Sequence, residues 1–162
     1  MLNELSANQS PANNYPPQKI FVWSTDEWGW RAFQSLTEWI VSQQISTKLV
    51  GVALSTQDDY APLIEKLAMN WQAVIYINQD PITVTADLGL NFGYPFPISQ
   101  IIIKQFPLGI MEIIDPLTAD NAYLTAELAA QRQDFLSHCF TRIFRRSVTT
   151  HGPKSNQSPA KN

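Results

Sequence analysis

Residues 87–117 begin with Asp87-Leu-Gly-Leu-Asn-Phe-Gly-Tyr-Pro-Phe-Pro-Ile98 and end with Leu108-Gly-Ile-Met-Glu-Ile-Ile-Asp-Pro-Leu117. The first part predicts a short strand that ends in a loop rich in glycine and proline. The second part predicts another strand, with a brief helix between the two. In open α/β sheets, ligands bind outside the carboxyl ends of the strands. The loops that follow these two strands are therefore the expected place of a site.

Three further apolar runs lie at residues 19–23, 48–54 and 73–77. They are continuous rather than alternating, which is typical of strands buried on both faces of a parallel sheet. The segments between them carry apolar residues at helical spacing, so each predicts a helix packed on the sheet. With strands at 87–91 and 109–114, we expect an open, mostly parallel, Rossmann-like α/β sheet of about five strands.

Short polar side chains mark where the helices are expected to begin. Ser24 and Glu27 have the spacing of a capping box, which satisfies the free N–H groups of a first turn. The caps expected for the later helices are, in chain order, Asp58 or Asp59, Ser99, and Asp120 or Asn121.

The connection between the third and fourth predicted strands is unusually short. Only residues 78–86 separate these strands, whereas a parallel crossover normally takes ~10–12 residues or more and contains a helix. We therefore predict an extended connection, and a face of the sheet that is thinly covered there.

Composition bounds the remaining possibilities. Residues 1–18 and 147–162 are rich in Asn, Ser, Gln and Pro and predict disordered arms around one α/β domain at 19–146. A net charge of −3 gives no general attraction to nucleic acid or anionic lipid. No apolar run approaches the ~20 residues of a spanning helix, and the first residues do not resemble a signal peptide. One cysteine excludes an internal disulfide, and we expect a cytoplasmic protein.

Four stretches follow the pattern of a known family, namely Lys19–Trp39, Leu49–Ser55, Asp87–Ile98 and Leu108–Leu117. In this order the chain resembles the amino-terminal domain of the formyltransferase family, which includes methionyl-tRNA formyltransferase. There an Asp-Leu-rich strand runs into a Gly-Tyr loop and an Ile-Pro helix, before Leu-Gly-x-x-Asn-Ile-His-Pro-Ser-Leu. The resemblance implies a Rossmann-like fold and 10-formyltetrahydrofolate as the donor of a formyl group to an amine.

Two positions depart from that pattern. Where the family has Asn and His, this chain has Glu112 and Ile114, and the later Asp of the family has no counterpart. Formyl transfer passes through an oxyanion that needs hydrogen-bond donors, and losing one such donor costs roughly 10²–10³ in rate. An ionised Glu only accepts hydrogen bonds, and Ile makes none. The chain is therefore expected to have lost formyl-transfer catalysis.

The loop Asn91-Phe92-Gly93-Tyr94-Pro95 is the candidate ligand-binding segment. Its aromatic rings, its glycine and its stiff proline suit a flat pocket wall, where relatives accept a pterin ring through backbone groups. The alternative is a structural turn whose Phe92 and Phe96 cap the core.

Glu112 and Asp115 are the candidate catalytic residues, because paired carboxylates perform acid–base chemistry or hold a cation. The alternative is one carboxylate in solvent and one Asp-Pro turn. No metal site is expected, since the adjacent His138 and Cys139 point about 100° apart on a helix.

The last predicted helix covers about 120–146, with an apolar stripe that includes Phe135, Cys139, Ile143 and Phe144. Such a stripe must be covered. Trp28 and Trp39, in the first predicted helix, are expected to be partly exposed, and exposed Trp suits a protein partner. The helix at about 120–146 is therefore a candidate homodimer interface, to which these tryptophans could contribute.

Three functions follow as hypotheses. The first is a formyltransferase-like domain that no longer catalyses but binds a small molecule or a protein. The second is an active transferase of one-carbon groups from a folate, with Glu112 or Asp115 as its base. The third is an interaction module that dimerises or binds another protein.

Overall fold

The computed structural model describes residues 17–78, 80–117 and 125–150, and the side chains of these as far as residue 145. It contains one sheet of five parallel strands in the order β4-β3-β2-β5-β6. The strands are β2 (Lys19–Ser24), β3 (Lys48–Leu54), β4 (Val74–Ile77), β5 (Leu88–Phe92) and β6 (Ile110–Glu112). The first strand lies at the centre, two later strands lie on one side of it, and the last two lie on the other. This order confirms the predicted Rossmann-like α/β sheet.

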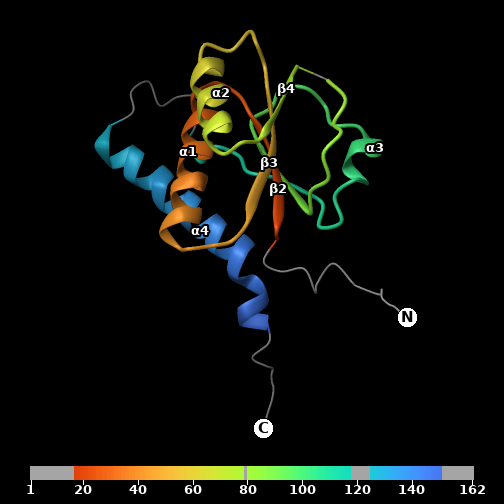
Figure 1. Cartoon of the computed structure of the whole chain (residues 1–162). Coiled ribbons are helices and arrows are strands. Elements are labelled where there is room, and N and C mark those ends of the chain that lie inside the picture. Colours follow the sequence, from red (N-terminus) through yellow and green to blue (C-terminus); the bar gives the residue numbers. More distant parts are fainter. Residues whose placement is uncertain (1–16, 79, 118–124, 151–162) are drawn as a thin grey trace, which may run out of the picture.

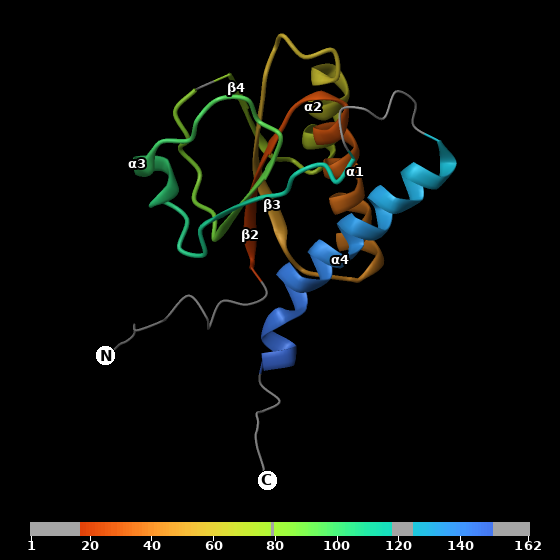
Figure 2. The same ribbon diagram turned by 180° about the vertical axis from the view of Figure 1, so that it is seen from behind.

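The two faces of the sheet are covered differently (Figures 1 and 2). On one face lie the helices α1 (Asp26–Ser42), α2 (Ala61–Asn70) and α4 (Ala126–Thr150). On the other lie the segment from residue 78 to 87 and the short helix α3 (Gln100–Ile103). A crossover that moves from one face to the other between β4 and β5 produces this arrangement.

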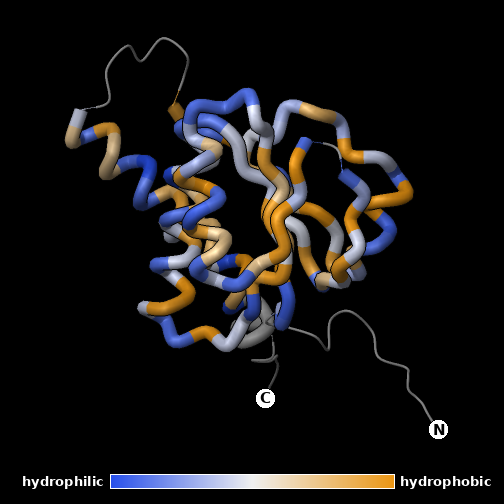
Figure 3. Tube along the Cα trace, turned by 45° about the horizontal axis from the view of Figure 1, so that its top comes forward, coloured by the Kyte–Doolittle hydropathy of each residue, from blue (hydrophilic) through white to orange (hydrophobic). Residues whose placement is uncertain are grey.

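Each face has its own hydrophobic core. The larger core lies under the helices, and its largest fully buried side chains are Ile20, Val22, Phe33, Leu36, Ile64, Leu88, Leu90, Phe92, Leu136, Phe140 and Phe144. The smaller core lies on the opposite face and consists mainly of aromatic rings, namely Phe21, Trp23, Tyr76 and Phe106. Figure 3 shows the apolar residues concentrated on the central strands. Burial on both faces explains why these strands read as continuous apolar runs.

Two glycines make room for the rings of the smaller core. Phe21 pairs in register with Gly51 on one side and with Gly89 on the other. A Cβ atom at Gly51 would lie 2.6 Å from the Phe21 ring, and one at Gly89 would lie 2.7 Å from the Trp23 ring. The adjacent glycines let both large rings lie flat on the sheet.

The connection between β4 and β5 is extended, as predicted. Between residues 78 and 87 the described residues contain no helix or strand. Tyr76 fixes this segment, because its hydroxyl accepts hydrogen bonds from Thr83 N at 3.2 Å and Val84 N at 3.1 Å. Ile82, Val84 and Ala86 then pack on the aromatic core. An extended strap thus takes the place of a crossover helix.

Helix α4 packs against α1. Trp39 contacts Phe140 and Phe144, with ring centroids 6.0 and 5.5 Å apart. The exposures predicted for two tryptophans were therefore wrong, because Trp28 is 8% and Trp39 9% exposed beneath this helix. The buried stripe of α4 also includes Leu136 and Phe140, whereas Phe135 and Cys139 are only partly buried.

The predicted helix caps were mostly wrong. Ser24 is the last residue of β2, and no side chain caps α1, since Thr25 occupies the N-cap with extended backbone. Helix α2 begins behind Tyr60, while Asp58 Oδ1 accepts from Tyr60 N in the preceding turn. Only Ser99 caps as predicted, its hydroxyl accepting from Ile102 N at 3.3 Å.

Helix α4 begins at Ala126, with the Thr125 hydroxyl accepting from Leu128 N at 3.1 Å. The predicted caps Asp120 and Asn121 lie outside the described residues, as do residues 1–16 and 151–162 of the arms predicted at 1–18 and 147–162. Asp87 Oδ2 accepts from Gln18 N at 2.9 Å, and α4 continues past residue 146.

Candidate functional site

Later strands are added on one side of β2 as far as β4 and on the other side from β5 onward, so the strand order reverses between β2 and β5. At this point the loop after β5 contacts the start of α1. Thr25 Oγ1 donates to Gly93 O at 2.7 Å, which joins the loop after β5 to the start of α1. A Cβ atom at Gly29 would lie 2.9 Å from Phe92 O. The crevice where nucleotides enter many Rossmann-like folds is therefore filled by the chain's own backbone.

The start of α1 is acidic. Asp26 N donates to Asp58 Oδ2 at 2.5 Å, and Asp26 itself has a positive φ of 64°. Burial, and then the neighbouring Asp58, raise the pKa of Asp26 above its ordinary value. Two carboxylates at this helix end oppose an anionic ligand.

An open hollow of about 490 Å³ lies one strand further along, at the carboxyl ends of β5 and β6. Its size falls within the usual ~300–1,000 Å³ of small-molecule pockets. The lining side chains are Asn91, Tyr94, Pro95, Phe96, Pro97, Ile98, Ile103, Ile110 and Glu112. The structure thus brings most of the predicted loop together with Glu112, one of the two candidate carboxylates.

Asn91 and Glu112 are neighbours across the two strands. They are register partners in the parallel pairing of β5 with β6, so their side chains lie on the same face of the sheet. Asn91 is 8% exposed, and its Oδ1 accepts from Tyr94 N at 2.9 Å. Among the described residues its Nδ2 has no hydrogen-bond partner. The hollow therefore offers an amide donor beside a carboxylate acceptor.

Tyr94 and Phe96 form the aromatic wall of the hollow. Their ring centroids lie 5.3 Å apart at 68°, an edge-to-face pair. The Tyr94 hydroxyl donates to Asn78 O at the end of β4, which fixes the ring. Burial, and then the nearby Asp80, raise the pKa of Tyr94 above its ordinary value. This tyrosine therefore remains protonated at neutral pH and keeps its hydrogen bond.

A second hollow of about 210 Å³ lies on the other side of this loop. Tyr94, Pro97 and Ile98 line both hollows and separate them. Asp80 and Trp23 are among the remaining side chains of the smaller one.

Two residues of the predicted loop do not reach the hollow. Phe92 is fully buried and packs edge-to-face on Phe140, 6.4 Å away, in the larger core. Gly93, with a φ of 81°, makes the turn that carries the chain from β5 to Tyr94. Phe92 therefore has the structural role given above as the alternative, while Asn91, Tyr94 and Pro95 line the hollow.

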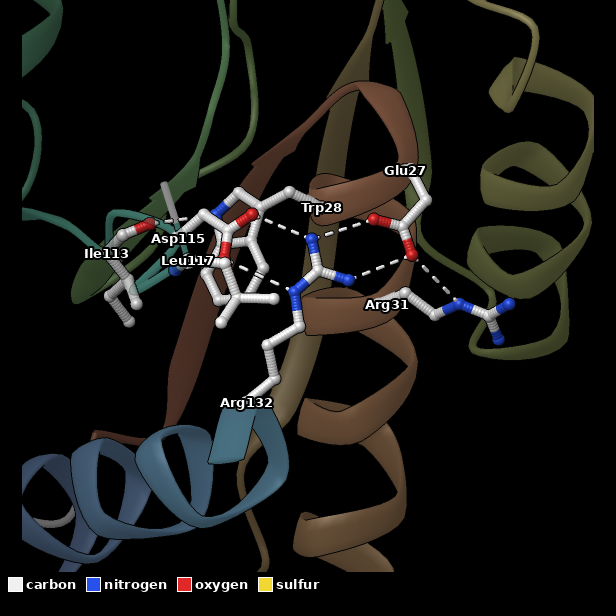
Figure 4. A network of polar contacts seen from close by, with 7 residues as sticks. All are labelled: Glu27, Trp28, Arg31, Ile113, Asp115, Leu117 and Arg132. Carbon is white, nitrogen blue, oxygen red and sulfur yellow. Dashed lines mark hydrogen bonds and ion pairs between the residues drawn. The ribbon is translucent and has the colours of Figure 1, made fainter. Parts of the chain in front are cut away.

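Asp115 does not join Glu112 in a pair, because an arginine of α4 binds it (Figure 4). Arg132 donates to Asp115 through Nε at 3.2 Å and Nη2 at 2.7 Å. It also contacts both oxygens of Glu27, at 2.9 and 2.8 Å. Its guanidinium carbon lies 5.4 Å from the centroid of the Trp28 ring. Asp115 is thereby part of an ion-pair network that holds α4 in place.

The same network explains why the polar groups of Arg132 and Trp28 are buried. Arg132 is only 9% exposed, and the hydrogen bond with Asp115 is the main reason that its pKa is raised above the ordinary value. Trp28 Nε1 donates to Ile113 O at 3.1 Å, which completes the polar contacts under α4. Neither the role of Arg132 nor the burial of Trp28 has a signal in the local sequence, since both depend on contacts between remote parts of the chain.

The remaining candidates have no arrangement that suggests chemistry. His138 is exposed, and burial raises the pKa of Cys139 while Arg142 opposes this. Within the residues that the structure describes, no group of three His, Cys, Asp or Glu side chains is placed to hold a metal. No helix in the described ranges is both long and apolar enough to cross a membrane.

No protein-family model matches the chain, and no curated protein matches its sequence.

Proposed function

We propose that the chain is a formyltransferase-like domain that binds a small, flat molecule in the hollow between the 91–97 loop and Glu112, and that it does not transfer a formyl group. The observation that carries this proposal is the register pairing of Asn91 with Glu112 under the Tyr94–Phe96 wall. Two polar groups beside an aromatic wall suit a ring with hydrogen-bonding atoms on one edge.

The same positions argue against catalysis. Glu112 occupies the place of the family's Asn and adds negative charge where an oxyanion would form. Ile114, in the place of the His, is 68% exposed and offers no donor. Asp115 is held by Arg132 and by Leu117 N, which donates to its Oδ1 at 3.0 Å. A base with these contacts is not available to a substrate amine.

The resemblance suggests the pterin ring of a folate, such as 10-formyltetrahydrofolate, as the first ligand to test. The predicted homodimer has less support than binding, because the apolar stripe of α4 packs on its own chain among the described residues.

Titration calorimetry with folic acid tests the binding half. We expect saturable binding by the full chain, and a loss of at least about tenfold in affinity in Phe96→Ala. Ile101→Ala is the matched control, since Ile101 is 77% exposed on α3 and does not line the hollow. If millimolar folic acid does not bind, a folate is ruled out as the ligand. If Phe96→Ala binds folic acid as tightly as the wild type does, the hollow is ruled out as the binding site.

An assay of formyl transfer tests the second part of the proposal, that the chain does not catalyse this reaction. The protein is incubated with 10-formyltetrahydrofolate and a primary amine, and the formylated amine is measured. We expect none above the background reaction. A product that disappears in Glu112→Ala would establish the active transferase instead.

A further inference from the structure

We infer that the hollow takes a ligand with a flat cationic group, an amidinium or a guanidinium, which pairs with Glu112. This inference rests on the proposed function, because both place the ligand in the same hollow. It adds the charge and shape of the group that the hollow recognises.

The charged side chains that line the two hollows beside the loop are both carboxylates, among the described residues. Within the part of the chain that the structure describes, Glu112 is the only Asp, Glu, Lys, Arg or His side chain that lines the hollow of 490 Å³. Within the same residues, Asp80 is the only one that lines the adjoining hollow of 210 Å³. Carboxylates lie on both sides of Tyr94, and the described lining of the two hollows has no cationic side chain, so a cationic group is favoured there over an anionic one.

The Glu112 carboxylate is available for such a pair. It is an exposed residue, and among the described residues no ion pair includes it. Arg142 lines the neighbouring hollow on the α4 side together with Glu112, yet forms no ion pair with it. The two oxygens of Glu112 therefore remain free to accept two parallel N–H groups.

The aromatic wall favours a flat group over a compact ammonium. A planar cation can stack on an aromatic face while its N–H groups reach a carboxylate in the same plane. The protein already holds one guanidinium in this manner, because Arg132 lies between two carboxylates and over the Trp28 ring. Glu112 with Tyr94 and Phe96 offers the same two kinds of partner, and no ion pair occupies Glu112 among the described residues.

Three probes of equal size and different charge test this inference. Benzamidinium is cationic, benzamide is neutral and benzoate is anionic, and each is titrated into the full chain by NMR or calorimetry. We expect benzamidinium to bind about tenfold more tightly than benzamide, and benzoate to bind most weakly. Added salt should weaken the binding of benzamidinium and leave that of benzamide unchanged.

Substitution of the carboxylate gives the second arm. Glu112→Gln keeps the shape and removes the charge, so it should abolish the preference for benzamidinium over benzamide. Glu38→Gln is the control, since Glu38 is exposed on α1 and lines a different groove. It should retain the preference.

The outcomes separate this inference from the proposed function. If benzamidinium and benzamide bind equally in the wild-type chain, and Phe96→Ala weakens both, the cation inference is wrong and the binding hollow stands. A preference that survives in Glu112→Gln also overturns the inference. If none of the three probes binds and folic acid does not bind either, both proposals are wrong.

Discussion

Arg132 joins three parts of the chain that are remote in sequence. Its partners Asp115 and Glu27 lie 17 and 105 positions away. Five nitrogen-bound hydrogens in a rigid plane let one guanidinium serve both carboxylates at once, which a lysine does not do.

Removal of this side chain should be costly. Arg132→Ala leaves Asp115 without its cation and Glu27 with the exposed Arg31 as its remaining partner, and we expect the free energy of unfolding to fall by about 2 kcal/mol in urea titration. This value is below that of a fully buried pair, because Glu27 and Asp115 are 34% and 26% exposed. Arg31→Ala is the control, since Arg31 is 53% exposed and contacts the same Glu27. The control should change stability by less than about 0.5 kcal/mol, and an equal loss in both variants would contradict the role given to Arg132.

Asp26 is expected to reduce stability at neutral pH. Its pKa is raised from 3.8 in the folded protein, first by burial and then by Asp58, so the folded protein holds this proton more tightly than the unfolded chain does. By linkage, the stability that Asp26 contributes is complete below its ordinary pKa and is lost as the pH rises through the raised value.

Asp26→Asn should therefore stabilise the protein at pH 7, by on the order of 0.5 kcal/mol. Asn also tolerates the positive φ of this position. Thermal unfolding from pH 3 to pH 7 provides the measurement, and the gain of the variant over wild type should grow with pH. A variant that is less stable than wild type at pH 7 would show that the Asp26 charge is favourable.

Some side chains could be predicted from sequence and others could not. Asn91, Tyr94 and Pro95 stood out because a glycine and prolines after a strand mark a loop at the ligand-binding edge. The buried positions of Trp28 and Arg132 had no local signal, since each depends on how α4 docks on α1. The pattern of a single helix indicates which residues share a face. It does not indicate how many further residues become buried when a neighbouring helix packs against it.

The strands were predicted well because burial on both faces leaves a continuous apolar run, which is independent of the rest of the fold. Helix starts were predicted poorly. Ser24 is the last residue of β2 rather than a helix cap, because the pairing of β2 with β5 extends as far as Ser24 and Phe92. The choice between cap and strand depends on that neighbour, which is more than sixty residues later in the chain.

Helix α4 should depend on its buried stripe rather than on its length. Phe140 is fully buried and contacts the rings of both Trp39 and Phe92. Phe140→Ala should reduce the free energy of unfolding by about 3–5 kcal/mol, because it opens a cavity between α4 and the sheet. His138→Ala, an exposed position on the same helix, should change it by less than about 0.5 kcal/mol. Chemical denaturation measures both, and a small loss for Phe140→Ala would mean that α4 is only loosely attached.

The extended segment after β4 determines how the molecule covers its second face. Tyr76→Phe removes the hydroxyl that accepts from two backbone N–H groups of this segment. We expect a loss of about 1–2 kcal/mol, because both donors lose their acceptor. Hydrogen exchange at Thr83 and Val84 should become faster, while exchange in β2 changes only with global stability. Unaltered exchange at Thr83 and Val84 would show that the hydroxyl does not hold the segment.

The short link predicted between the third and fourth strands was sufficient to predict this extended segment, because its nine residues, 78–86, are fewer than the ~10–12 or more that a crossover with a helix takes. The candidate site was predicted only in part. The loop and Glu112 were identified separately, and their meeting in one hollow depends on the register between β5 and β6. Register across such a crossover is a property of the folded sheet.

The strands also shorten from the middle of the sheet outward. The central β2 and β3 have six and seven residues, whereas the outermost β4 and β6 have four and three. An edge strand of three residues has very few unpaired backbone N–H and C=O groups, so it offers little for pairing with an edge strand of another molecule. The tapered outline should keep concentrated solutions of this protein free of fibrillar association.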